Sequence, residues 1–143
     1  MFPLWMKRDG KTTRNTPEHW TLLVLCLKNH EWSFYNSLQD REGGGKDVHL
    51  ERAKILVTYI ERKIKEIYGR SNPGVVFTKP KVMACLQQEA TSMDCGVVVC
   101  SVIENLLSGK RMKSGTITHA SAGNFRKKMV EQFMVSPFFV KSV

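Results

Sequence analysis

Four polar side chains in this sequence are of the types that a cysteine hydrolase requires. Cys95 supplies a thiol, and His19 supplies an imidazole that can hold the pair as thiolate and imidazolium. Asn36 can accept a hydrogen bond from that imidazole and orient it, and Gln88 can donate an amide N–H to a developing oxyanion. The sequence therefore predicts nucleophilic catalysis at Cys95 if the fold brings these residues together.

The cysteines also have a purely structural interpretation. A cysteine in an apolar run is more often a small buried hydrophobe than a nucleophile, and we interpret Cys26, Cys85 and Cys100 in that way. Cys95 differs because polar residues precede it. A zinc site is disfavoured because the sequence contains no CxxC pair. We therefore expect reduced thiols and neither a metal nor another cofactor.

A β-hairpin is predicted to position the histidine and the asparagine. Residues 20–27 form an apolar run of strand length, and residues 31–38 alternate apolar and polar side chains. The three residues 28–30 between them have the length of a hairpin loop. Since paired strands of a hairpin are antiparallel, the start of the first lies beside the end of the second. His19 and Asn36 should therefore lie near each other.

Helices are predicted to follow the hairpin. Residues 48–70 repeat apolar side chains at three- and four-residue steps, and His49 at their start is expected to be solvated. A second helix, 96–107, is apolar nearly all round and places Cys95 at its first turn, where the helix dipole favours a thiolate. The remaining predicted elements are two short strands (75–78 and 81–86), a basic loop (108–120) and an amphipathic helix (123–135).

Length and composition fit one globular domain. The chain has 143 residues, of which 42% are hydrophobic and 24% charged. Residues 1–18 are expected to be an irregular lead-in, and 19–143 a single domain. With no apolar run long enough to span a bilayer, we expect a soluble intracellular monomer, nuclear or cytoplasmic. The net charge of +9 favours an acidic partner surface or nucleic acid.

The order of these residues resembles that in the Ulp/SENP-type proteases, which process ubiquitin-like modifiers such as SUMO. The resemblance covers roughly residues 19–107 and is carried by the ordered set His19-Trp20, Asn36, Gln87-Gln88 and Asp94-Cys95-Gly96. It implies an α+β, papain-like cysteine protease fold of the Ulp/adenain type. In such a fold, helices flank a central, mostly antiparallel sheet.

The resemblance also implies a reaction. It is hydrolysis of peptide or isopeptide bonds after the Gly-Gly tail of a ubiquitin-like modifier, and the partner is that modifier or its protein conjugates. The catalytic centre is then Cys95, His19 and Asn36, with Gln88 as the oxyanion donor. Trp20 inherits the role of a wall of the narrow slot that admits the tail.

Three features depart from the family pattern. The family usually has Asp in place of Asn36, so Asn36→Asp is expected to raise the rate if this side chain faces His19. The spacing from Gln88 to Cys95 is one residue longer than usual, which puts Glu89 in the register of the oxyanion donor unless the loop contains one extra residue. The third is that only 18 residues precede His19, fewer than in family domains.

Two other functions therefore stay open. One is a truncated, catalytically weak or inactive relative that acts as a modifier- or protein-binding module. The other is a basic nucleic-acid-binding module, although no recognisable motif for one is present.

Overall fold

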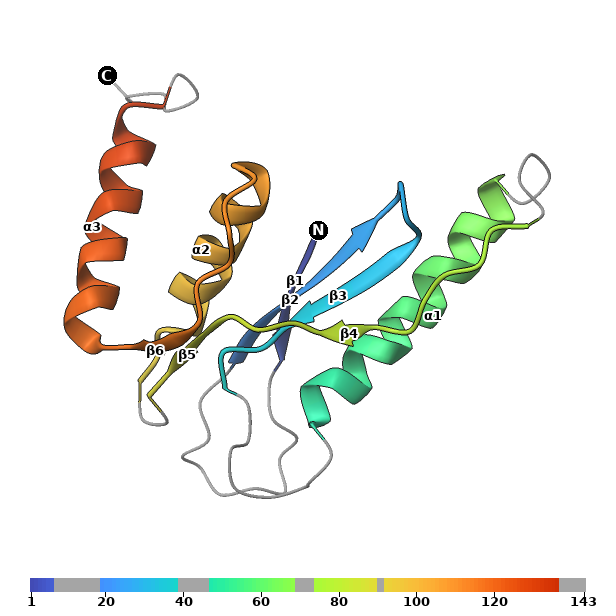
Figure 1. Cartoon of the computed structure of the whole chain (residues 1–143), viewed down its shortest axis with the longest axis horizontal. Coiled ribbons are helices and arrows are strands. Elements are labelled where there is room, and N and C mark those ends of the chain that lie inside the picture. The colour runs from blue at the N-terminus through green and yellow to red at the C-terminus, as the bar shows by residue number, and fades with distance from the viewer. Residues whose placement is uncertain (7–18, 39–46, 69–73, 90–91, 137–143) are drawn as a thin grey trace.

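The computed structural model describes residues 1–6, 19–38, 47–68, 74–89 and 92–136 (Figure 1). These residues form strands and helices in alternating groups, so the chain is an α+β protein. The elements in chain order are β1 (Phe2–Met6), β2 (His19–Cys26), β3 (Glu31–Tyr35), α1 (Val48–Tyr68), β4 (Lys81–Val82), β5 (Leu86–Gln88), α2 (Cys95–Leu107), β6 (Gly115–Ile117) and α3 (His119–Met134).

The main sheet has four strands in the order β1-β2-β3-β4. The β1–β2 and β2–β3 pairs are antiparallel, and the short β3–β4 pair is parallel. This confirms the predicted hairpin and the mostly antiparallel sheet. Strands β5 and β6 form a separate parallel pair beside α2 and α3 (Figure 1).

Both faces of the sheet are covered, which explains why β2 is apolar without alternation from Leu22 to Cys26. Successive side chains of a strand point to opposite faces. Leu22 accordingly joins a core cluster with Val98 and Val102 of α2, whereas Leu23 joins a second cluster with Ala53 and Val57 of α1. In Figure 1, α1 lies on one side of the sheet, and α2 and α3 lie on the other. Cys95 begins the helix that packs directly on β2.

The N-terminal residues differ from expectation. Residues 2–6, assigned to an irregular lead-in, form β1 at the edge of the sheet, while residues 7–18 lie outside the described part of the chain. Phe2 and Leu4 pack against the α1-side cluster, and Trp5 stays exposed. The five residues of β1 are all apolar and include Pro3, so they lack the alternation of apolar and polar side chains that signals a strand.

Two further predictions were wrong in detail. Residues 75–78 form no strand, and among the described residues one backbone hydrogen bond, from Thr78 N to His30 O (3.0 Å), ties this segment to the hairpin. The predicted basic loop contains β6, and α3 begins at His119 rather than at residue 123. The early start of α3 follows from a capping box between Thr118 and Ser121.

Candidate active site

The hairpin brings His19 and Asn36 into contact. His19 is the first residue of β2, Asn36 directly follows β3, and both side chains are buried. Nε2 of His19 lies 2.7 Å from Oδ1 of Asn36. Since a carbonyl oxygen only accepts, Nε2 must carry the proton in this contact, which leaves Nδ1 as the basic nitrogen. This tautomer is the one that can take a proton from a thiol.

The amide of Asn36 is held on both sides, which fixes its orientation. Its Oδ1 also accepts a hydrogen bond from Leu38 N (2.9 Å), and its Nδ2 donates to Oδ2 of Asp47 (3.0 Å). A flipped amide would lose both contacts. Asn36 therefore presents an acceptor, and not a donor, to the imidazole.

A second imidazole lies beside the first. His49, in the first turn of α1, was expected to be solvated, but its ring centroid is 4.8 Å from that of His19. The side chain is partly buried. No local pattern predicts this contact, because it depends on how α1 packs on the hairpin.

The thiol of Cys95 completes the contact with His19. Burial raises the pKa of this thiol, but a hydrogen bond from His19, hydrogen bonds from the backbone of Trp20 and Gly96, and the charge of the imidazole together lower it below its usual range. Burial lowers the pKa of His19, but its contacts with Cys95 and Asn36 and the charges of Cys95 and Asp47 raise it above its ordinary value. These opposite shifts favour a thiolate–imidazolium pair.

Cys85 shows what burial does without such a partner. Its thiol is also buried, and its Sγ donates to the backbone oxygen of Asn36 (3.4 Å). Burial raises the pKa of Cys85 to about 11, and the backbone contact offsets only part of that effect. Cys85 is therefore protonated at neutral pH, as expected of a structural cysteine. Cys26 and Cys100 were also expected to be buried, but both are exposed.

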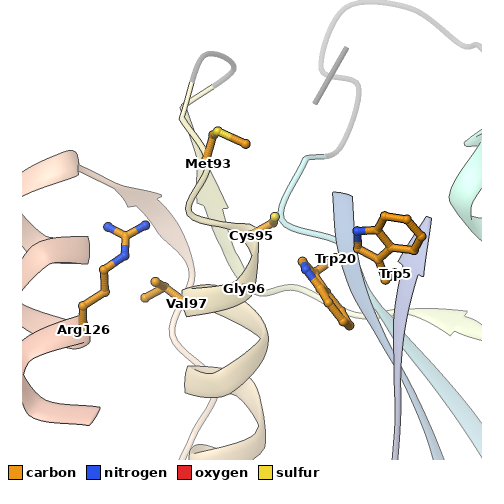
Figure 2. A pocket seen from close by; sticks show the side chains of 7 residues that line it. All are labelled: Trp5, Trp20, Met93, Cys95, Gly96, Val97 and Arg126. Atoms are coloured by element: carbon orange, nitrogen blue, oxygen red, sulfur yellow. The ribbon is translucent and has the colours of Figure 1, made fainter. Parts of the chain in front are cut away.

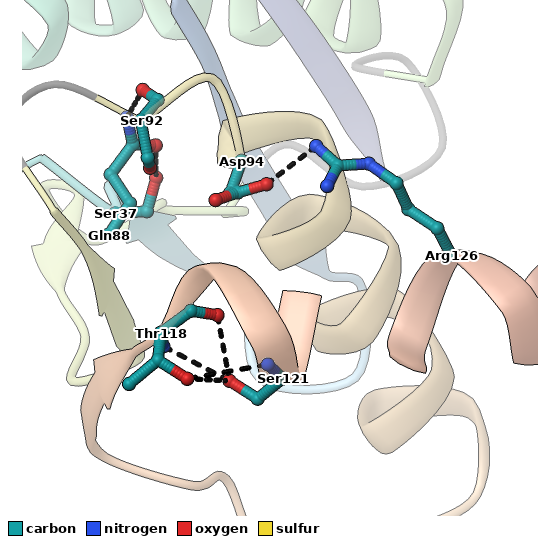
Figure 3. Close-up of polar contacts among 7 residues, drawn as sticks. All are labelled: Ser37, Gln88, Ser92, Asp94, Thr118, Ser121 and Arg126. Atoms are coloured by element: carbon teal, nitrogen blue, oxygen red, sulfur yellow. Dashed lines mark hydrogen bonds and ion pairs between the residues drawn. The ribbon is translucent and has the colours of Figure 1, made fainter. Parts of the chain in front are cut away.

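Gln88 is buried, and its carboxamide is held in place. Its Oε1 accepts from Ser37 Oγ (2.9 Å), and its Nε2 donates to the backbone oxygen of Ser92 (2.8 Å; Figure 3). Gln87 instead donates to the backbone oxygens of Asn36 and Cys85, and Glu89 is exposed. Of these three residues, Gln88 is the one that is both buried and fixed on the segment leading to Cys95, but no direct contact joins it to the thiol.

A cavity of about 290 Å³ opens beside Cys95. Trp20 and Trp5 lie directly opposite each other on β2 and β1, and both line the cavity while remaining partly exposed (Figure 2). Met93, Gly96, Val97 and Arg126 complete its lining. Trp5 was missed from the sequence, because only the register of β1 against β2 places it beside Trp20.

The residue before the nucleophile is tied to the third helix. Asp94 is 1% exposed, and neither of its oxygens accepts a well-aligned hydrogen bond within the described residues. Its charge is compensated by Arg126 of α3, whose Nη2 lies 2.5 Å from Oδ1 (Figure 3). Since a buried carboxylate needs a partner, this ion pair stabilises the turn that carries Cys95.

Replacing Arg126 tests whether its ion pair with Asp94 stabilises the protein. Arg126→Met keeps the aliphatic stem but leaves Asp94 without a counter-charge, so we expect the free energy of unfolding in urea to fall by about 1–3 kcal/mol. Lys128→Met is the matched control on the same helix, because its partner Glu104 is partly exposed, and should cost less than about 1 kcal/mol. Equal losses in the two variants would contradict the assigned role of Arg126.

The fold is α+β, and an activated thiol at the N-terminus of a helix contacts an imidazole. This combination of fold and site defines a cysteine protease. The family model described as Ulp1 protease family, C-terminal catalytic domain, matches residues 14–135, so the chain belongs to this family. It is thus a cysteine protease hydrolase, of a family that acts on ubiquitin-like modifiers. A comparison with curated proteins found no match.

The described residues add two negative observations. No helix among them is long and apolar enough to cross a membrane. Nor do these residues include a group of three or more His, Cys, Asp or Glu side chains arranged to hold a metal ion.

Proposed function

We propose that this protein cleaves peptide or isopeptide bonds after the Gly-Gly tail of a ubiquitin-like modifier, through a centre made of Cys95, His19 and Asn36. The observation that carries the proposal is the contact between the Cys95 thiol and the His19 imidazole, with the pKa of the thiol lowered and that of the imidazole raised. The tryptophan-lined cavity beside the thiol supports it.

In the first half of the reaction, the Cys95 thiolate attacks the carbonyl carbon of the terminal glycine. The carbonyl oxygen takes up the electron pair and becomes an oxyanion. When the tetrahedral intermediate collapses, the C–N bond breaks, and the His19 imidazolium gives its proton to the departing amine. The modifier remains attached to Cys95 as a thioester.

In the second half, water hydrolyses the thioester. His19, now neutral, accepts a proton from the water as its oxygen attacks the thioester carbonyl. The C–S bond breaks, Cys95 leaves as thiolate, and the modifier is released with a free carboxylate. Asn36 keeps Nδ1 of His19 directed at the reacting atoms throughout, because Nε2 stays bonded to its Oδ1.

Two N–H groups are proposed to stabilise the oxyanion. The backbone N–H of Cys95 belongs to the first turn of α2, where N–H groups have no partner inside the helix. Gln88 Nε2 has two protons, of which Ser92 takes one, and we assign the second to the oxyanion. Such a donor is worth about 3–4 kcal/mol of transition-state stabilisation.

Selectivity for glycine is proposed to come from Trp20 and Trp5. Their side chains lie opposite each other on neighbouring strands, beside the thiol, and form one wall of the cavity. A tail without side chains can lie flat against this wall, whereas a Cβ would meet an indole ring. The slot therefore selects a tail that lacks side chains and does not recognise a particular chemical group.

A panel of modifiers carrying a C-terminal thiol-reactive group tests the proposal. We expect covalent adduct formation with at least one modifier ending in Gly-Gly, and a rate about 10–100-fold lower when the tail is Ala-Ala, because the added methyl groups overpack the slot. Trp20→Ala should narrow that difference. Tyr59→Ala, an exposed aromatic on α1, should leave it unchanged. No adduct with any modifier in the panel would overturn the proposal.

The basic charge gives less support to nucleic-acid binding than the sequence suggested. The run 126–128 on α3 was one of its basic segments. Arg126 is paired with Asp94, and Lys128 Nζ lies 2.7 Å from Glu104. Two of its three cations are thus already paired within the protein.

A further inference from the structure

We infer that Asp47 is a positioning residue that holds the side-chain amide of Asn36 in place. Its carboxylate also provides the negative charge near His19 that the neutral Asn36 lacks. The inference deepens the proposed Cys-His-Asn centre and rests on it. Asp47 lies 11 residues beyond Asn36, and nothing in its sequence context marked it as part of the site.

The carboxylate of Asp47 makes two kinds of contact. Its Oδ1 accepts hydrogen bonds from His49 N (2.9 Å) and Leu50 N (3.1 Å), so it caps the N-terminus of α1. Its Oδ2 accepts the bond from Asn36 Nδ2 (3.0 Å). The cap fixes the carboxylate in place, and the carboxylate in turn fixes the amide.

These contacts form a chain from the carboxylate to the thiol. Asp47 Oδ2 binds Asn36 Nδ2, Asn36 Oδ1 binds His19 Nε2, and His19 contacts Cys95. An amide whose N–H groups donate to an anion becomes a stronger acceptor at its oxygen, because successive hydrogen bonds polarise one another. The charge of Asp47 also favours the imidazolium directly across space, and it contributes to the raised pKa of His19.

Among the described residues, other titratable groups also face this chain. The ring of His49 lies 4.8 Å from that of His19, and a positive charge there would oppose the imidazolium. The Cys85 thiol contacts the backbone oxygen of Asn36 but stays neutral, since burial raises its pKa to about 11. Among the described residues that form this series of hydrogen bonds, Asp47 is therefore the one anion besides the Cys95 thiolate.

Asp47→Asn removes the negative charge and, because the one remaining oxygen caps α1, also removes the acceptor for Asn36 Nδ2. Asparagine also caps helices well, so α1 keeps its cap and the melting temperature should change little. We expect the NMR titration midpoint of His19, read from its ring Cε1–H signal, to fall by about half to one pH unit. The alkaline limb of kcat/KM for cleavage should move down by the same amount. His19→Gln identifies the signal among the four histidines of the chain.

Glu51→Gln is the matched control. It removes one negative charge from the same turn of α1, but its carboxylate pairs with Lys54 at the surface. We expect no change in the His19 midpoint. If Asp47→Asn and Glu51→Gln leave that midpoint at the same value, the inference is wrong. Asp47→Ser, which keeps a capping hydroxyl but is too short for the Asn36 contact, serves as a second variant and should show at least as large a fall.

A charge exchange gives the sharpest comparison. Asn36→Asp alone places a second carboxylate beside that of Asp47, with an oxygen at the position where Asn36 Nδ2 now lies 3.0 Å from Asp47 Oδ2. These like charges repel, so this variant should be no more active than the parent chain, contrary to the expectation from sequence. Asn36→Asp combined with Asp47→Asn restores a donor between the two side chains and sets the charge beside His19. This double variant should have the highest His19 midpoint of the set.

The outcomes separate the inference from the function on which it rests. If Cys95→Ala leaves the His19 midpoint unchanged and that midpoint is ordinary, the proposed catalytic pair itself is refuted. If the midpoint responds to Cys95→Ala but not to Asp47→Asn, only the role of Asp47 fails. A rise in activity for Asn36→Asp alone would also refute that role.

Discussion

Cys95→Ala is expected to abolish proteolysis, with a fall in kcat/KM on the order of 10⁴–10⁶. Without a sulfur at this position no acyl-enzyme can form, and the imidazole of His19 has no nucleophile to activate. The measurement is cleavage of a modifier–protein conjugate, with adduct formation by a thiol-reactive modifier as a second readout. Both signals should disappear together.

Cys100→Ser is the control for this experiment. Cys100 lies on the same helix, α2, but its side chain is exposed and is not part of the cavity lining. We expect parental activity and a parental adduct. An adduct that persists in Cys95→Ala and disappears in Cys100→Ser would show that Cys100, and not Cys95, is the nucleophile.

His19→Ala is expected to lower kcat/KM by about 10²–10⁴ and to raise the pKa of Cys95. The hydrogen bond from His19 is the largest of the effects that lower the pKa of this thiol. When the imidazole is removed, burial still raises the pKa and less opposes it. Thiolate is present above the pKa of a thiol. The alkylation rate of Cys95 should therefore reach its half-maximum at a higher pH than in the parent chain.

Iodoacetamide labelling followed by peptide mass spectrometry measures this shift, because it distinguishes Cys95 from the exposed Cys26 and Cys100. His119→Gln, at the exposed start of α3, is the control and should leave the profile of Cys95 in place. An unchanged profile in His19→Ala would show that the imidazole does not set the state of the thiol.

Local patterns were enough to predict the hairpin and the first two helices. The first strand of the hairpin is an apolar run, and the second alternates apolar and polar side chains. The helix α1 repeats apolar side chains at three- and four-residue steps, and α2 is apolar nearly all round. β1 and β6 were missed because they have only five and three residues, and what stabilises each of them is pairing with a strand distant in sequence. No local pattern reports such a partner.

The same distinction holds at the site. The contact between His19 and Asn36 was expected because antiparallel pairing alone brings the hairpin ends together. Trp5, Asp47 and Arg126 were missed, since each reaches the site through the packing of a different element. The reactive types were visible in the sequence, whereas the residues that hold them became visible only in three dimensions.

The two reactive groups are carried by different elements, His19 by β2 and Cys95 by α2. Side-chain packing between Leu22 and the valines of α2 joins these elements, whereas hydrogen bonds hold each of them together internally. Opening this packing while the helix and the sheet keep their internal hydrogen bonds costs less free energy than global unfolding. The enzyme should therefore lose activity while its circular dichroism is still that of the folded chain, so that heat inactivation reports on one helix–sheet interface and not on the whole protein.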